Sequence, residues 1–331
     1  MSAEKRIISN TDWFQGYHDK YSIKRIENAD LTDTLSKARK YTADDIVIIN
    51  SASRQLFYHC IAKILYPNVN YCLISIDLIL SKPNNIVDKI KSKLLELLFR
   101  KVDYFILYMK DWAGYKKHYN IKEEQLKYIP FKINSYYELA HINITDEGYI
   151  FSGGMSKRDY NTLFKAVDGQ DVKLVVMVPS LEKCRKHGTI ILDTVPSNVT
   201  IIHDDFSVAS WNECIAKARF VVIQISKDTI SPTGISTYLV AMALRKCVII
   251  SEGPATINII PDGCAIIVKP ENIEELRKAI LRVNTDANYR NYIAENGYKY
   301  AMSLKGHDRL VSDIVDFVEN KVTQLAHFNT C

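Results

Sequence analysis

The chain lacks the features that mark a membrane-spanning or secreted protein. No apolar run reaches the roughly 18 residues that a helix needs to span a bilayer. The N-terminal stretch MSAEKRIISNTDWFQGYHDK has no apolar core of the kind found in secretory signals. We therefore expect a cytoplasmic protein.

The sequence also has little that could hold a metal ion or a disulfide framework. Its 7 cysteines are scattered, and no CxxC, HExxH or clustered His/Asp pattern occurs. We therefore predict reduced cysteines that pack as small apolar residues. We also predict no metal site and no bound cofactor.

The composition is that of a folded globular protein. Hydrophobic residues make up 47% and charged residues 24% of the 331 residues, which excludes long disorder. The chain is too long for one ordinary core, so the length predicts two domains. The net charge is +5, and between Lys82 and Lys132 basic residues outnumber acidic residues by two to one. Because no nucleic-acid-binding motif accompanies this excess, we expect no nucleic acid partner.

Two blocks of β-branched and aromatic runs alternate with helical patterns, which is typical of parallel α/β sheets. In the first block we predict strands at 44–51, 70–77, 102–109 and 126–131, and helices at 31–40, 52–66 and 86–101. In the second we predict strands at 149–154, 172–179, 198–205, 218–226, 246–253 and 265–270, and helices at 159–168, 207–217, 234–245 and 271–283. The predicted fold is therefore α/β, with two Rossmann-like doubly wound domains facing a cleft.

The predicted domain boundary lies where the apolar pattern is lost, in residues 132–148. We place the first domain at 1–145 and the second at 146–305. Residues 295–322 are predicted to be helical throughout. The terminal segment 306–331 is predicted to cross back to the first domain.

A possible phosphate site lies in SPTGISTYLVAMALRKCVII, residues 231–250. A helix is predicted to begin near Ile235, and helix N-termini present unpaired amides and the positive end of the macrodipole. Gly234 would let an anion approach these amides, and hydroxyl donors are available from Thr233, Ser236 and Thr237. The alternative is a plain capping loop, because Ser and Thr are favoured at helix starts.

A second possible phosphate site lies in YIFSGGMSKRDY, residues 149–160, where a strand enters a glycine turn. The turn contains Ser152, Gly153 and Gly154, and a diphosphate could be neutralised by Lys157 or Arg158. It is not a dinucleotide fingerprint, because no third glycine follows at the required spacing. The alternative is a tight turn with surface charges. Because both features follow strands of one domain, together they predict a nucleotide diphosphate.

The stretch GISTYLVAMALRKCVIISEGPATINIIPDGCAIIVKPENIEELRKAI resembles the donor-binding half of GT-B-fold glycosyltransferases, in particular their family 4-like group. The matching positions are Gly234, Ala241, Met242, Ala243, Asp262, Gly263, Val268, Pro270, Glu271, Leu276, Ala279 and Ile280. SGGMSKRDYNTLFKA is similar to the first strand, turn and helix of that domain. The segment ISIDLIL…VDYFILYMKDWAGYKKHYN…YIPF is more loosely similar to the acceptor domain.

The resemblance implies a metal-independent transferase that takes a sugar from a UDP- or GDP-linked donor. It places the diphosphate on Gly234, Ile235, Ser236 and Thr237, with Arg158 or Lys157 opposite. It places the nucleobase at His203 to Phe206, including Asp205. The implied acceptor is a glycan, lipid-linked or other glycoconjugate in polysaccharide synthesis.

One position departs from the family pattern. Val240 stands where many retaining members carry a glutamate that holds the ribose, and Glu252 is a substitute candidate. An inverting mechanism would need a general base, for which Asp77 and Asp111 are candidates because each follows a predicted strand. The alternative for both aspartates is a helix cap or a turn.

The basic segment 86–102, IVDKIKSKLLELLFRKV, has one apolar stripe flanked by lysines and arginine. Such a helix can lie on an anionic membrane surface, which would suit a lipid-linked acceptor and a peripheral location on the inner face of the cell membrane. The alternative is an ordinary helix that covers the sheet with its apolar face.

Two other functions fit the same architecture. One is a nucleotide-sugar epimerase, which needs no acceptor. The other is a catalytically degenerate GT-B module that acts as a scaffold for an active subunit, a hypothesis favoured by the departure at Val240.

Overall fold

The computed structural model describes residues 5–26, 30–51, 54–189, 194–204 and 207–328. The contacts divide the chain into two compact units, Met1–Ile129 and Pro130–Cys331. The boundary between the units, after Ile129, lies earlier in the chain than the predicted domain boundary after residue 145. The hydrogen bond from Thr145 N to Ala216 O shows why, because it ties the connecting segment to the second unit. The predicted return of the terminal segment to the first domain stays a prediction.

The first unit contains a parallel six-stranded sheet within the described residues, in the order β2-β1-β3-β4-β5-β6. Its strands are β1 (Arg6–Ser9), β2 (Ser22–Arg25), β3 (Asp45–Asn50), β4 (Cys72–Ile76), β5 (Tyr104–Leu107) and β6 (Leu126–Tyr128). The four predicted strands are confirmed as β3 to β6. The pattern did not indicate β1 and β2, because RIIS contains only two apolar residues and SIKR only one, and β2 is largely exposed.

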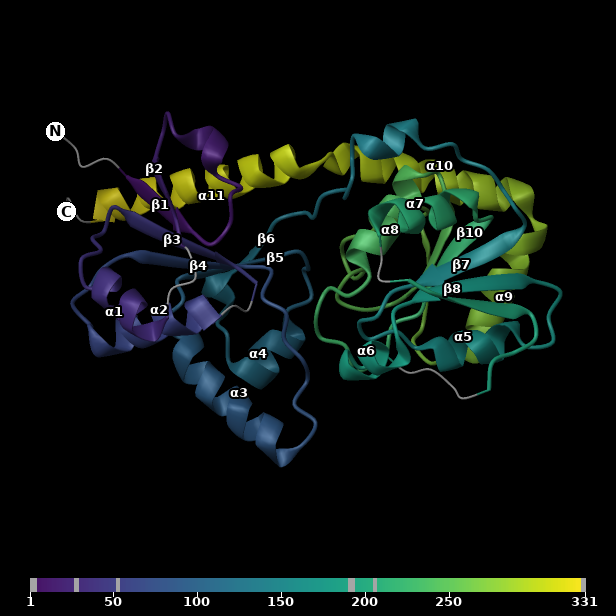
Figure 1. Cartoon of the computed structure of the whole chain (residues 1–331), viewed down its shortest axis with the longest axis horizontal. Helices are drawn as coiled ribbons and strands as arrows, with labels where there is room; N and C mark the ends of the chain where they lie inside the picture. Colours follow the sequence, from purple (N-terminus) through teal and green to yellow (C-terminus); the bar gives the residue numbers. More distant parts are fainter. Residues whose placement is uncertain (1–4, 27–29, 52–53, 190–193, 205–206, 329–331) are drawn as a thin grey trace. The chain divides into compact units, whose positions relative to one another are not determined.

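The helices of this unit follow one another along one side of its sheet (Figure 1). They are α1 (Leu31–Ala38), α2 (Arg54–Leu65), α3 (Ile86–Phe99) and α4 (Ala113–Tyr119). Asp30 and Asn85 start α1 and α3, since each side chain accepts a hydrogen bond from an amide of the first turn. Three of these helices were predicted from the sequence, whereas α4, which has only 7 residues, was missed.

The second unit also contains a parallel six-stranded sheet within the described residues, in the order β12-β11-β10-β7-β8-β9. Its strands are β7 (Tyr149–Gly153), β8 (Lys173–Val178), β9 (Val199–His203), β10 (Phe220–Ile223), β11 (Val248–Ser251) and β12 (Ile266–Val268). All were predicted. The order reverses between β7 and β10, which makes this the doubly wound arrangement expected from the sequence.

Helices cover both faces of this sheet (Figure 1). They are α5 (Tyr160–Val167), α6 (Leu181–Lys186), α7 (Val208–Lys217), α8 (Ile235–Ala243), α9 (Ile273–Thr285) and α10 (Ala287–Leu304). On one face α5 and α9 pack on a core that includes Phe164, Val222 and Ile280. On the other face, α8 and α10 pack closely at Gly297 of α10. A Cβ there would lie 3.1 Å from Cγ of Met242 in α8 and 2.8 Å from Cys264 O.

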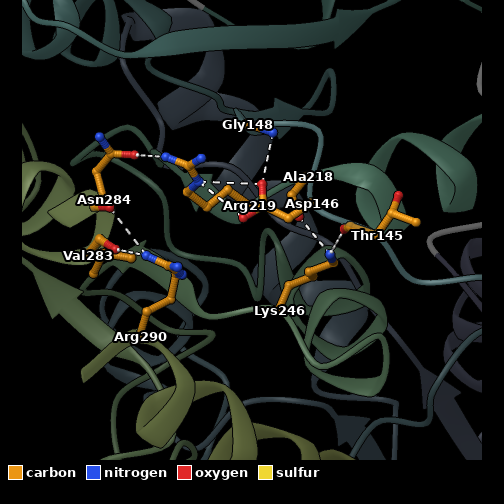
Figure 2. Close-up of polar contacts among 9 residues, drawn as sticks. All are labelled: Thr145, Asp146, Gly148, Ala218, Arg219, Lys246, Val283, Asn284 and Arg290. Carbon is orange, nitrogen blue, oxygen red and sulfur yellow. Dashed lines mark hydrogen bonds and ion pairs between the residues drawn. The ribbon is translucent and has the colours of Figure 1, made fainter. Parts of the chain in front are cut away.

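The amino end of this sheet is held by a polar cluster (Figure 2). The buried Lys246 ammonium donates to Thr145 O at 2.7 Å and to Ala218 O at 2.6 Å. Arg219 forms an ion pair with Asp146 at 3.2 Å. These bonds join the segment before β7 to the segments before β10 and β11, and so order the strands whose opposite ends carry the candidate site.

The predicted continuous helix over 295–322 is wrong. The stretch is divided into α10 and α11 (His307–Phe328) by Lys305, whose φ of 54° is left-handed. The break is stabilised by Arg309, which donates to Pro130 O and Phe131 O. The backbone at residues 130–131, where the chain enters the second unit, is therefore hydrogen-bonded next to this break.

The sequence led us to expect free cysteines, no membrane-spanning helix and no metal site. Six cysteines are free thiols, and Cys331 lies outside the described part. No helix in the described part is long and apolar enough to cross a membrane. No group of three His, Cys, Asp or Glu side chains in the same residues could hold a metal ion.

Candidate anion-binding site

The loops that follow β7 and β10 meet at the point where the strand order of the second sheet reverses. Open α/β sheets bind ligands outside the carboxyl ends of their strands at such a point. The chain leaves β7 toward α5 and leaves β10 toward α8, which lie on opposite faces of the sheet. An antiparallel bridge between Arg158 and Ile225 joins the two loops.

The first turn of α8 has unused backbone donors. Its N-cap is Gly234, with no side-chain cap, whereas side chains cap α5, α7, α9 and α10 in the same unit. The amide of Tyr238 is the first to bond within the helix, to Gly234 O at 3.1 Å. The amides of residues 234–237 donate to no described protein atom. They present the positive end of the helix dipole.

The conformation of Gly234 explains why glycine stands there. Its φ of +94° is left-handed, and a Cβ would lie 3.2 Å from Cγ2 of Ile223 and 3.4 Å from Cδ1 of Ile225. The glycine therefore lets the start of α8 pack on the ends of the sheet. It positions the free amides through packing, rather than by leaving space for an anion on its own Cα.

Arg158 lies beside this helix start and is almost fully buried, with 4% of its surface exposed. Its guanidinium donates to Gly153 O at 2.9 Å, to Ser156 O at 3.2 Å and to Thr237 Oγ1 at 3.3 Å. None of the ion pairs in the described part involves Arg158, and burial lowers the pKa of its guanidinium. A buried cation next to a positive helix end is costly unless an anion compensates it.

The glycine turn accommodates the protein's own side chains, and its predicted role in binding a ligand stays a prediction. A Cβ on Gly154 would lie 2.7 Å from Nη2 of Arg158, and one on Gly153 would lie 2.6 Å from the Trp211 ring. The amide of Gly154 already donates to Met177 O at 3.2 Å. The two glycines therefore make room for Arg158 and Trp211.

Lys157 points elsewhere. Its Nζ lies 3.0 Å from the position of a Cβ on Gly188, and its φ is 52°. Its amide donates to His187 O. Of the two predicted basic residues, the structure thus brings only Arg158 into contact with Thr237.

Four buried polar atoms beside these loops have no hydrogen-bond partner in the described structure. They are Ser152 Oγ, Gln224 Nε2, Ser226 Oγ and Thr229 Oγ1. Gln224 is otherwise held, because its Oε1 accepts from Ser251 Oγ at 2.9 Å. Buried donors without partners are rare in folded proteins and mark places where a ligand or water completes the bonding. Sequence analysis missed Gln224, although a polar residue directly after an apolar strand was a usable signal.

Of the predicted nucleobase residues, His203 lies at the edge of the sheet. His203 ends the edge strand β9, and its Nδ1 lies 3.1 Å from Pro179 O. Asp205 and Phe206 lie outside the described residues. No described contact joins His203 to the loops after β7 and β10, so its role stays a prediction.

The remaining predicted residues of this unit divide by burial. Ile235 and Thr237 are buried in the first turn of α8, while Thr233 and Ser236 are half-buried. Val240 is 3% exposed within the same helix, which fits the apolar packing of α8. Glu252 is exposed, and its amide donates to Val268 O at 2.8 Å.

The two candidate bases belong to the first unit, and their surroundings differ. Asp77 follows β4 with a left-handed φ of 54°, and no described group hydrogen-bonds to its carboxyl. Burial raises its pKa to about 7. Asp111 instead accepts a hydrogen bond from Ala113 N at the start of α4. Asp77 therefore combines a carboxyl that no described group engages with a pKa suited to proton transfer near neutrality.

Comparison with known proteins gives structural likeness only. No protein-family model and no curated protein sequence matches the chain. It is similar to HepE from Anabaena in complex with UDP and glucose, with a TM-score of 0.65, 13% identity, and 96% of this chain and 99% of that chain covered. It is also similar to sucrose-phosphate synthase from Thermosynechococcus elongatus, with a TM-score of 0.65, 16% identity and coverages of 89% and 77%.

A glycosyltransferase from Rickettsia africae is similar as well, with a TM-score of 0.62, 13% identity and coverages of 96% and 90%. The chain therefore has the two-unit α/β fold of these glycosyltransferases. At this level the predicted fold class and the resemblance to GT-B-fold enzymes are confirmed.

Proposed function

We propose that this protein is a glycosyltransferase that takes a sugar from a nucleotide-diphosphate donor without a metal ion. The observation that carries the proposal is the pairing of Arg158 with the open first turn of α8. An acidic group is absent from this pairing among the described residues, and a diphosphate supplies the missing charge. The structures of HepE with UDP, glucose and UDP-glucose support a donor of this class.

The proposed role of the site is to stabilise the leaving group. When the bond between the sugar and the diphosphate breaks, negative charge grows on the diphosphate oxygens. Amides of residues 234–237 would donate to these oxygens. The positive charge of the buried Arg158 would attract them as well, and this attraction is strong because the charge is close and shielded from water. Fixed donors of this kind need no rearrangement during the reaction.

We further propose that Asp77 accepts the proton of the acceptor hydroxyl. Its raised pKa and unengaged carboxyl suit a general base at neutral pH. The acceptor in this proposal is a glycan or a lipid-linked saccharide, used in polysaccharide synthesis on the cytoplasmic side of the membrane.

The test is calorimetric titration with UDP, GDP, UMP and GMP, followed by incubation of the protein with the preferred nucleotide sugar. We expect saturable binding of one diphosphate, at least about tenfold tighter than binding of its monophosphate, since a charged hydrogen-bonding group is lost. No saturable binding would favour the scaffold alternative. Epimerised sugar formed without any acceptor would identify the epimerase instead.

A further inference from the structure

The apolar stripe of α3 faces away from the protein. The exposed fractions are 76% for Ile86, 58% for Val87, 58% for Ile90, 60% for Leu94 and 53% for Leu97. At 3.6 residues per turn these five positions share one face of the helix. The ordinary alternative, a helix that covers the sheet with its apolar face, is therefore wrong for this stripe.

The buried face of α3 is partly polar, and specific contacts explain why. Glu96 accepts hydrogen bonds from Asn120 at 2.7 Å and from Arg100 at 2.9 Å, and Phe99 packs edge-on against Phe105 at 5.5 Å. Ser92 is buried on the same side. These contacts fix the rotation of the helix, so the stripe cannot turn inward without breaking them.

The stripe is bordered by positive charge. Lys89 and Lys93 lie along one side of it, and Lys91 lies along the other. Lys93 is paired with Glu96, whereas Lys89 and Lys91 form no ion pair with described residues. Long basic side chains beside an apolar face can reach anionic headgroups while their stems stay with the apolar surface.

We propose that α3 docks the protein on an anionic lipid surface, lying parallel to it with the stripe in the acyl boundary. A helix of this length spans about 21 Å along the membrane. Self-association is disfavoured, because a symmetric contact would bring the lysines of two copies together. Lipid headgroups supply the opposite charge, and both apolar insertion and electrostatic attraction contribute to binding.

The test is co-sedimentation of the full-length protein with vesicles of phosphatidylcholine alone or with about 30% phosphatidylglycerol. We expect binding to the anionic vesicles that weakens with added salt, because charge attraction is screened. Leu94→Glu should reduce binding at least about tenfold, since it removes apolar contact and adds a repelled charge. Leu65→Glu is the matched control, because Leu65 is 55% exposed at the end of α2 and the charge change is the same.

A second pair of variants separates the two contributions. Ile90→Gln removes apolar contact without changing charge, and Lys89→Gln with Lys91→Gln removes charge without touching the stripe; each should weaken vesicle binding. Circular dichroism checks that the variants fold. Absence of binding to anionic vesicles at low salt would overturn the proposal. So would a dimer in solution that Leu94→Glu converts to a monomer, which would identify the stripe as a contact between copies.

Discussion

Arg158 Nη2 lies 3.3 Å from Thr237 Oγ1, and this contact joins the loop after β7 to the first turn of α8. Both side chains are buried, and the guanidinium has no carboxylate partner in the described part of the chain. The contact places a fixed positive charge beside backbone amides that have no acceptor. Such an arrangement is poised for an anion.

Arg158→Ala should weaken binding of the preferred nucleoside diphosphate by about 1.5–3 kcal/mol, because the diphosphate loses the buried positive charge beside it, a loss comparable with that of a hydrogen bond to a charged group. Calorimetric titration measures this change. Lys157→Ala is the control from the same loop, and its smaller expected effect follows from its position over Gly188. Equal losses in the two variants, or unchanged affinity in Arg158→Ala, would remove Arg158 from the site. Thermal unfolding checks that each variant is folded at the temperature of titration.

Gly234→Ala should displace the first turn of α8 and lower both stability and nucleotide affinity. The left-handed backbone costs about 1–2 kcal/mol for alanine, and contact with Ile223 adds to it. Gly169→Ala is a matched control, because Gly169 has a φ of +70° with no atom within 4 Å of an added Cβ. We expect only the backbone cost and normal nucleotide binding there. Denaturant unfolding and calorimetry distinguish the two variants.

The rate of transfer should rise with pH through about 7, because Asp77 acts as a base only when deprotonated. Asp77→Asn should abolish transfer and preserve the backbone, since asparagine tolerates left-handed φ. The pKa of Asp77 in the folded state, about 7, lies above the unfolded value of 3.8. Between these pH values the unfolded state loses the proton first, so the free energy of unfolding falls as the pH rises. The variant should therefore be more stable than the wild type at pH 8, by roughly 1–3 kcal/mol.

Asp111→Asn provides the comparison for Asp77, because that carboxylate is engaged at the start of α4. It should retain a pH profile like that of the wild type. Initial rates across pH, with unfolding measured at pH 5 and 8, separate the two aspartates. A transfer rate in Asp77→Asn equal to that of the wild type would exclude Asp77 as the base.

Lys246 predicts a pH dependence of stability in the alkaline range. Burial lowers its pKa from 10.5 to about 8, so above pH 8 the folded state loses this proton while the unfolded state keeps it. The stability of the wild type should therefore rise relative to that of Lys246→Met as pH increases from about 8 toward 10. At pH 7 the Met variant should be less stable by about 1–3 kcal/mol, because two carbonyls lose their donor.

Lys227→Met is the control for this comparison, since Lys227 is exposed beyond the end of β10. It should change stability little at either pH. A constant difference between the wild type and Lys246→Met across the alkaline range would contradict the lowered pKa. Denaturant unfolding at several pH values measures both effects.

Much of the fold could be predicted because local patterns sufficed. The run DIVIIN formed β3 and KLVVMV formed β8, since β-branched residues suit strands covered on both faces. The strands missed, β1 and β2, contain too few apolar residues to show a pattern. The break at Lys305 was also missed, because it depends on carbonyls at 130 and 131 that are distant in sequence.

The candidate site was predicted less completely. The start of α8 near Ile235 and the glycine before it were predicted from the sequence, which left open whether that start is capped. The sequence could not show that Arg158 points inward while Lys157 points to Gly188, since adjacent basic residues look alike in a pattern. Gln224 was missed although it directly follows an apolar run, because its orphaned donor exists only in the folded chain.

By itself the sequence determined the alternation of strands and helices, the glycine at the start of α8 and the existence of an apolar stripe on α3. These follow from spacing and from the intrinsic preferences of neighbouring residues. Only the tertiary structure decided which side of α3 meets solvent and which cation lies beside α8. Periodicity shows that a helix has two faces, but long-range partners such as Asn120 and Thr237 select what each face contacts.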